Sequence, residues 1–155
     1  APQYDGPDGT WSRPDMGMLE LTSQLKWRML DLPWAVWASW AHNCEENYEG
    51  FDNDLYNKND AFGVGVKVGE NKKKGDWSVA YTYVYIEAFS EPAILADASI
   101  GGPNAQGHVI QGVYNIDDFL TVGANLYLTQ AIDSYAATWN SNLRTLFQLE
   151  MIWKF

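Results

Sequence analysis

The sequence LRTLFQLEMIWKF, residues 143–155, decides the fold class of this chain. Every second residue from Leu143 to Phe155 is large and apolar except Thr145, whereas the residues between them are of mixed polarity. A β-strand points successive side chains to opposite faces, so this period of two predicts a strand with one apolar and one mixed face.

The same period of two recurs in six segments upstream. They are residues 18–30, 34–42, 62–69, 77–85, 108–116 and 120–129. The segment 108–116 is the weakest, because apolar residues occupy both of its faces. No segment carries the sustained stripe of an amphipathic helix. We therefore predict an all-β chain with about seven antiparallel strands.

The lengths of these segments and of their connections favour a membrane. The predicted strands have about 9 to 13 residues, whereas strands of soluble proteins usually have about five or six and a tilted transmembrane strand needs about 9 to 11. The short connections are residues 30–33, 69–76 and 117–118, and the long ones are 43–59, 89–107 and 130–142. Outer-membrane barrels alternate in this way between short periplasmic turns and long extracellular loops. The pattern predicts an antiparallel transmembrane β-barrel.

Composition excludes several other classes. The chain has 155 residues and a net charge of −10, which argues against nucleic-acid binding because that requires a basic surface. A hydrophobic content of 46%, with 15% aromatic residues, excludes a disordered acidic tail. One cysteine is too few for a disulfide framework.

Three phrases resemble the C-terminal part of the "putative porin" family of outer-membrane β-barrels. They are KKKGDWSVAYTYVYIEA (72–88), GHVIQGVYNIDDFLTVGANLYLT (107–129) and LFQLEMIWKF (146–155). The resemblance spans roughly residues 18–155 and implies a diffusion channel of about 14 to 18 strands in the bacterial outer membrane. It also implies that Phe155 is the assembly signal that the barrel assembly machinery recognises. It implies no catalytic residue, metal or cofactor.

The number of strands bears on how the barrel is completed. With Phe155 in the periplasm, counting back seven strands places residues 1–16 outside the cell, as an extension or loop remnant before the barrel strands of 17–155. A complete single-chain barrel has an even number of strands. We therefore expect this chain to be the C-terminal portion of a larger barrel. Another chain or an N-terminal fragment would supply the remaining strands, surrounded by outer-membrane lipid, and a homo-oligomer is a further option.

Alternation also assigns candidate pore-lining residues to the mixed face. They are Glu20, Lys26, Arg28, Lys67, Arg144, Glu150 and Lys154. Five basic and two acidic groups predict a mild anion preference, because wall charge tunes the selectivity of porins. The alternative interpretation is that these charges only hydrate the lumen and pair with one another.

Tryptophan residues are candidates for the aromatic girdles of the barrel. Trp34 and Trp40 share a face and lie about 20 Å apart along a strand. This spacing suits two girdles that border an apolar band of about 25 Å once the strand is tilted. Trp77 and Trp153 are further candidates on the periplasmic side.

Other polar clusters carry weaker signals. Residues 43–60 hold six acidic groups against Lys58, which fits either a Ca²⁺ or Mg²⁺ loop or a solvated outer loop. His42 and Cys44 are too few ligands for a metal site. Lys72, Lys73 and Lys74 fit a hydrated periplasmic turn.

Two other functions remain open from the sequence. The first is a small complete barrel that modifies lipids, with His108 beside Ser99 or Ser134 in a catalytic triad, although no spacing supports one. The second is a soluble acidic β-sandwich that binds glycans through exposed tryptophan and tyrosine side chains.

Overall fold

The computed structural model describes residues 4–5, 11–12, 17–45, 58–90, 99–133 and 142–154. Seven long strands form one antiparallel sheet, in which each strand pairs with the next along the chain. These strands are β3 (Met18–Met29), β4 (Leu32–Asn43), β5 (Asp60–Gly69), β6 (Trp77–Ile86), β7 (Ala105–Asp117), β8 (Leu120–Ala131) and β9 (Arg144–Trp153). The predicted all-β, antiparallel architecture is confirmed.

Two very short strands lie near the N-terminus. They are β1 (Tyr4–Asp5) and β2 (Trp11–Ser12), and they pair with each other in a separate sheet. Among the described residues no helix is long and apolar enough to cross a membrane.

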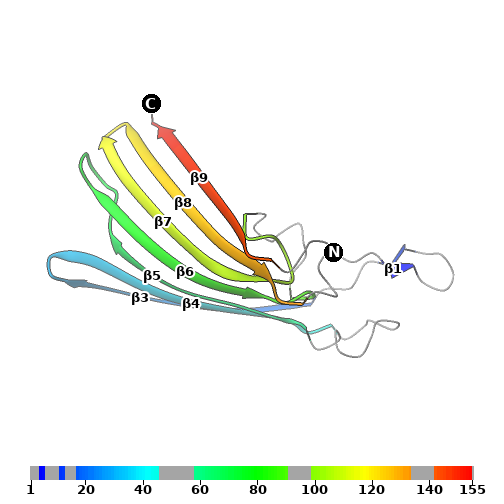
Figure 1. The fold of residues 1–155 in the computed structure, drawn as a ribbon. Helices are drawn as coiled ribbons and strands as arrows, with labels where there is room; N and C mark the ends of the chain where they lie inside the picture. Colours follow the sequence, from blue (N-terminus) through cyan, green and yellow to red (C-terminus); the bar gives the residue numbers. More distant parts are fainter. Residues whose placement is uncertain are drawn as a thin grey trace.

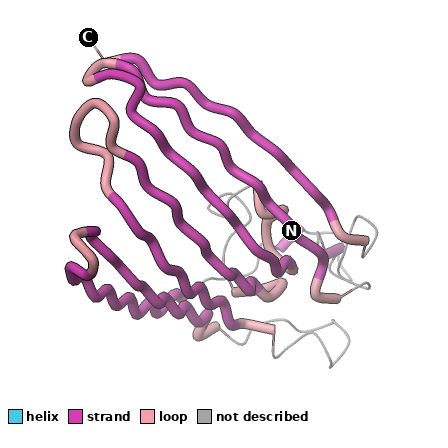
Figure 2. The backbone as a smooth tube through the Cα atoms, turned by 60° about the vertical axis from the view of Figure 1, so that its left-hand side comes forward, coloured by secondary structure: helices cyan, strands magenta, loops and turns pink. Residues whose placement is uncertain are grey.

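The seven-stranded sheet is strongly curved, as in a section of a barrel wall (Figure 1). The short β3–β4, β5–β6 and β7–β8 turns gather at one end, together with the C-terminus, and the longer connections gather at the other (Figures 1 and 2). We call these the turn end and the loop end. The alternation of connection lengths in the sequence thus corresponds to two distinct ends of the sheet.

The sheet is open, with β3 and β9 at its two edges. Because the strands alternate in direction, β3 and β9 run the same way, and pairing them would require a parallel ladder. The described strands form one layer with no second sheet packed against it. A β-sandwich requires two packed sheets, so the alternative of a soluble sandwich is wrong for this part of the chain.

The β3–β4 connection is tighter than the sequence indicates. The predicted loop of residues 30–33 contracts to Leu30 and Asp31, whose φ angles are 53° and 60°. Positive φ at both central residues is the type I′ turn that matches the twist of paired strands. The sequence does not signal this turn, because neither Gly nor Asn occupies it. Pro33 falls inside β4, before that strand begins to pair with β5 at Trp34.

Strand β7 is longer than its sequence pattern indicates, with 13 residues instead of the nine predicted. A register shift between Asn115 and Asp117 places an irregularity opposite the start of β8. The register is regular from Ala105 to Asn115, so the weak signal arises instead from apolar residues on both faces, including Val109, which packs against a buried apolar cluster.

Hydrogen bonds join the β5–β6 and β7–β8 turns at the turn end. Gly75 N donates to Asn115 O at 2.8 Å, and Asn115 N donates to Asp76 O at 2.9 Å. The carboxylate oxygen Oδ2 of Asp76 accepts from the backbone N–H groups of Lys72 (3.0 Å) and Lys73 (2.9 Å). Asp76 therefore holds the Lys72 and Lys73 part of the three-lysine turn, whereas the backbone N–H of Lys74 donates to Asp118 Oδ1 at 2.7 Å.

Asp76 should make this turn sensitive to acid. The N–H groups of Lys73 and Lys72 hold the pKa of the Asp76 carboxyl below its ordinary value of 3.8. Its stabilisation of the turn is therefore fully present above 3.8 and is lost as pH falls through the lower folded pKa. An NMR titration should show the Lys72 and Lys73 amide resonances moving only below 3.8, and Asp76→Asn should abolish this movement. A midpoint above 3.8 would contradict this assignment.

Candidate functional site: the two faces of the sheet

Strand pairing sorts the side chains into two continuous faces. Directly paired residues of antiparallel strands point to the same side. One face, the outer face, contains the row Leu25–Val36–Val66–Tyr81–Ile110–Leu126–Phe147. The other, the inner face, contains the row Lys26–Ala35–Lys67–Ala80–Gln111–Asn125–Gln148. The apolar and mixed faces of the individual segments thus join into two whole surfaces.

The polarity of these surfaces is the reverse of that in a soluble protein. On the outer face Leu25, Phe147 and Leu149 are 64%, 60% and 75% exposed. On the concave inner face Ser78, Asn125 and Thr129 are buried, and Thr129 is 0% exposed. Soluble proteins bury leucine and phenylalanine and expose most polar groups. This sheet therefore suits an apolar medium outside and a polar interior.

Aromatic side chains border the outer face at both ends. At the turn end, Trp27 stacks on Trp34 with ring centroids 6.2 Å apart, Trp77 pairs with Tyr114, and Trp153 pairs with Leu120. At the loop end, Trp40 pairs with Phe62, which stacks on Tyr85 at 5.1 Å. The tryptophan candidates thus divide between the ends: Trp34, Trp77 and Trp153 at the turn end and Trp40 at the loop end.

The turn-end aromatic row slopes across the sheet. The register that starts at Trp34 of β4 reaches β9 at Leu149, four residues before Trp153. Four residues along the strand over five strand spacings correspond to a slope of about 30°. Strands of outer-membrane barrels tilt by about 35–45°, so this row would run nearly level along the surface of a bilayer.

Six of the seven candidate pore-lining charges lie on the inner face by strand register. Glu20, Lys26 and Arg28 are on β3, Lys67 is on β5, and Arg144 and Glu150 are on β9. Lys154 follows β9, and its backbone N–H donates to Phe119 O at 2.9 Å. Lys26 and Lys67 both flank Ala35 in one row, and Arg28 lies one inner position beyond Lys26 toward the turn end. The structure thus gathers three of the basic groups on one part of the inner face.

Residues 99–104, which we call the lumenal segment, fold onto the inner face over β6 to β9. Ile100 is buried with Ile86, Ala105 and Tyr127, and Val109 and Leu146 pack against this cluster. Gln148 Nε2 of β9 donates to Ser99 Oγ at 3.5 Å, and Asn104 Nδ2 donates to Asp133 O at 2.7 Å. The segment therefore covers the β6–β9 part of the inner face, and its cluster reaches β5 only at Ala61, near the loop end, without including any residue of β3 or β4.

The sequence gives little signal for this segment. The sequence predicts that residues 89–107 form an extracellular loop, and Gly101 and Gly102 predict a turn within it. Their φ angles are 118° and 82°, but two glycines do not indicate to which side of the sheet the chain turns. One isoleucine in a polar loop is a weak pattern. Its burial depends on apolar residues from five strands, which only the assembled sheet brings together.

The histidine candidates do not form the sites considered from the sequence. His42 Nδ1 lies 3.0 Å from Asp60 Oδ1, and Cys44 is exposed. His108 lies on the outer face, with its Nδ1 2.7 Å from the Tyr81 hydroxyl, whereas Ser99 lies over the inner face. The triad with Ser99 is therefore wrong. No three His, Cys, Asp or Glu residues within the described ranges form a metal-binding group.

Three further candidates fall outside the described residues. They are Ser134, the acidic stretch 46–57 and the assembly signal at Phe155.

A family model described as "Putative porin" matches residues 16–155. This chain belongs to that family. No match was found among curated proteins or among solved structures. Family membership agrees with the exposed apolar outer face and the polar inner face, and the resemblance seen in the sequence is confirmed.

Proposed function

We propose that this chain forms part of the wall of an outer-membrane porin that lets small hydrophilic solutes and ions diffuse passively. The outer face would contact lipid, the inner face would line a water-filled lumen, and the loop end would face the outside of the cell. The observation that carries the proposal is the outer face, whose middle row is apolar in all seven strands, opposite an inner face that holds six of the candidate charges. A lumen needs polar walls, and lipid tolerates only apolar ones.

The proposed transport needs no catalytic group. Pore width and wall charge select the solutes that pass. A lipid-modifying enzyme would instead need a nucleophile and a base at the outer rim. His108 on the outer face has a tyrosine partner and a tilted Tyr83 ring at 5.3 Å, which suits an interfacial aromatic cluster.

Strands from outside this sheet would complete the barrel. The free edges of β3 and β9 carry unpaired backbone groups, which lipid cannot satisfy. Since β3 and β9 run in the same direction, an odd number of added strands would close the barrel with antiparallel pairs throughout. The mass of the purified assembly in detergent tests this: it should clearly exceed the 17.5 kDa of this chain. A detergent-dependent particle containing only one such chain would contradict it.

Electrical recording tests the proposed channel. The completed protein, reconstituted in a planar bilayer, should give stepwise conductance increases that persist without any energy source. Liposomes containing it should swell in small sugars but not in large dextrans. Inserted protein with no conductance in either assay would overturn the proposal.

The lumenal segment should narrow this pore. Ile100→Ala removes most of a buried side chain, and such changes typically cost about 2–5 kcal/mol. Even 2 kcal/mol raises the detached population of the segment about 30-fold, so conductance should rise. Ile116→Ala is the matched control, because Ile116 is 44% exposed.

Chemical labelling checks the cause of that rise. In a Cys44→Ser background, a cysteine introduced by Ser99→Cys should react faster with a maleimide when Ile100→Ala is also present. Unchanged labelling and conductance would show that Ile100 does not hold the segment.

A further inference from the structure

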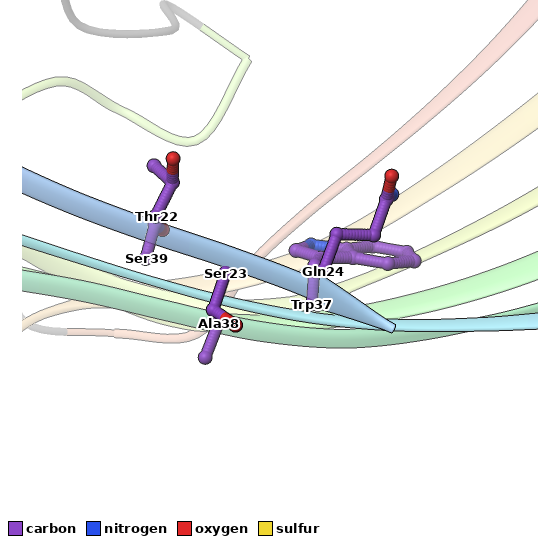
Figure 3. A pocket seen from close by; sticks show the side chains of 6 residues that line it. All are labelled: Thr22, Ser23, Gln24, Trp37, Ala38 and Ser39. Carbon is purple, nitrogen blue, oxygen red and sulfur yellow. The ribbon is translucent and has the colours of Figure 1, made fainter. Parts of the chain in front are cut away.

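A shallow recess lies on the inner face of β3 and β4, in the area that the lumenal segment leaves uncovered. Thr22 pairs with Ser39 and Gln24 pairs with Trp37, so these four side chains mark its corners. Figure 3 shows Thr22, Gln24 and Trp37 projecting to one side of the two strands, with Ala38 pointing the other way. Ser23 and Ala38 also line the recess, whose volume is about 480 Å³ and which is largely open to solvent.

Trp37 forms a flat apolar surface at this recess. Its partner on β5 is Gly65, and a Cβ atom added there would collide with the Trp37 indole. The missing side chain allows the indole to lie over the β5 backbone instead of projecting into the lumen. Gly63 has the same effect beside Ser39, since its added Cβ would lie 3.1 Å from Ser39 Oγ. Because neither glycine has a side chain, nothing projects from the inner face of β5 beside the Trp37 indole at these two positions.

Charge is distributed unevenly around the recess. Lys26 follows Gln24 on the inner face of β3, Lys67 follows Gly65 on β5, and Ala35 separates them on β4. The two lysines are two strand spacings apart, about 10 Å, and the methyl of Ala35 leaves the space between them open. Glu20 lies on the opposite, loop-end side of Thr22. An anionic group would therefore be attracted to the lysine side and repelled from the Glu20 side.

We propose that this recess is a binding site for sugar acids passing through the pore, that is, for a pyranose ring bearing a carboxylate. The apolar face of the ring would stack on Trp37, its hydroxyl groups would exchange hydrogen bonds with Thr22, Gln24 and Ser39, and its carboxylate would lie between Lys26 and Lys67. The inference rests on the proposed porin function and adds a solute class to it.

Block of the reconstituted channel by glucuronate tests the site. Glucose has the ring without the carboxylate, and gluconate has the carboxylate without the ring. Glucuronate should reduce the current at a concentration about tenfold lower than either, because only it uses both parts of the site. Equal potency of the three compounds would overturn the proposal.

Variants separate the two parts of the site. Trp37→Ala should weaken glucuronate block about fivefold and leave gluconate block unchanged. Lys67→Gln should weaken block by both acids and leave glucose block unchanged. Gln111→Ala is the control, since Gln111 is an exposed inner-face residue on β7, away from the recess.

A third variant covers the case in which Trp37→Ala does not assemble. Gln24→Ala changes an exposed side chain on β3 and should weaken glucuronate block about fivefold. Unchanged glucuronate block in either Trp37→Ala or Gln24→Ala would overturn the site. A channel that conducts but shows no preference for glucuronate refutes this inference alone, whereas inserted protein that does not conduct refutes the porin function.

Discussion

Ile110→Lys should lower the free energy of unfolding of the barrel in lipid by about 2–4 kcal/mol, whereas Gln111→Lys should leave it almost unchanged. Ile110 lies in the middle row of the outer face, between Tyr81 and Leu126, and is 42% exposed. Gln111 is the next residue, is also exposed, and lies on the inner face. A lysine on the lipid face near the bilayer midplane costs about 2–4 kcal/mol. A lysine on the inner face remains in water.

This pair of variants distinguishes an outer face in lipid from one in water, because in water lysine at either position would have a similarly small effect on stability. Exposed surface substitutions in water usually change stability by less than about 0.5 kcal/mol. The measurement is the free energy of unfolding in urea for protein folded into lipid vesicles, with the fraction folded read from gel mobility. Equal stability of the two variants would show that the outer face does not contact lipid.

Reversing three basic residues of the inner face should convert the pore from anion preference to cation preference. Lys26→Glu, Arg28→Glu and Lys67→Glu together change the seven candidate pore-lining charges from a net +3 to a net −3. Lys26 and Arg28 lie on β3 and Lys67 lies toward the turn end of β5, away from Ala61, the only β5 residue of the Ile100 cluster. Ions moving along this part of the wall pass close to these groups, so their charge should dominate selectivity.

The reversal potential in a tenfold salt gradient measures this change. Full selectivity gives about 59 mV in either direction, and the triple variant should shift the wild-type value by roughly 20 mV toward cations. The control is Lys58→Glu, Lys72→Glu and Lys73→Glu, which changes the total charge by the same amount but lies outside the strands, once at the loop end and twice at the turn end. A shift of the same size in the control would assign selectivity to the overall charge of the protein. A wild-type cation preference would contradict the predicted anion preference directly.

Much of the fold could be predicted from local patterns, because alternate residues of a strand point to opposite faces and therefore differ in polarity. The end of the chain, residues 143–155, shows this most clearly, and the pairing of Ala124 with Leu149 places Leu149 on the outer face as its alternation predicts. The prediction was weaker where local rules fail. Val109 and Val113 on the inner face obscure the alternation of β7, and the Leu30–Asp31 turn uses residues that do not ordinarily favour positive φ.

The strands, their apolar and mixed faces, and the faces of six candidate charges follow from the amino-acid sequence alone. These properties depend on the period of two, which each strand carries within about ten residues. The register of neighbouring strands, the slope of the turn-end aromatic row and the packing of Ile100 against the inner face required the tertiary structure. It also decided that Trp37 lies over Gly65 and that Lys26 and Lys67 flank Ala35. Such contacts join residues up to about 50 positions apart, and no local pattern encodes a distance between strands.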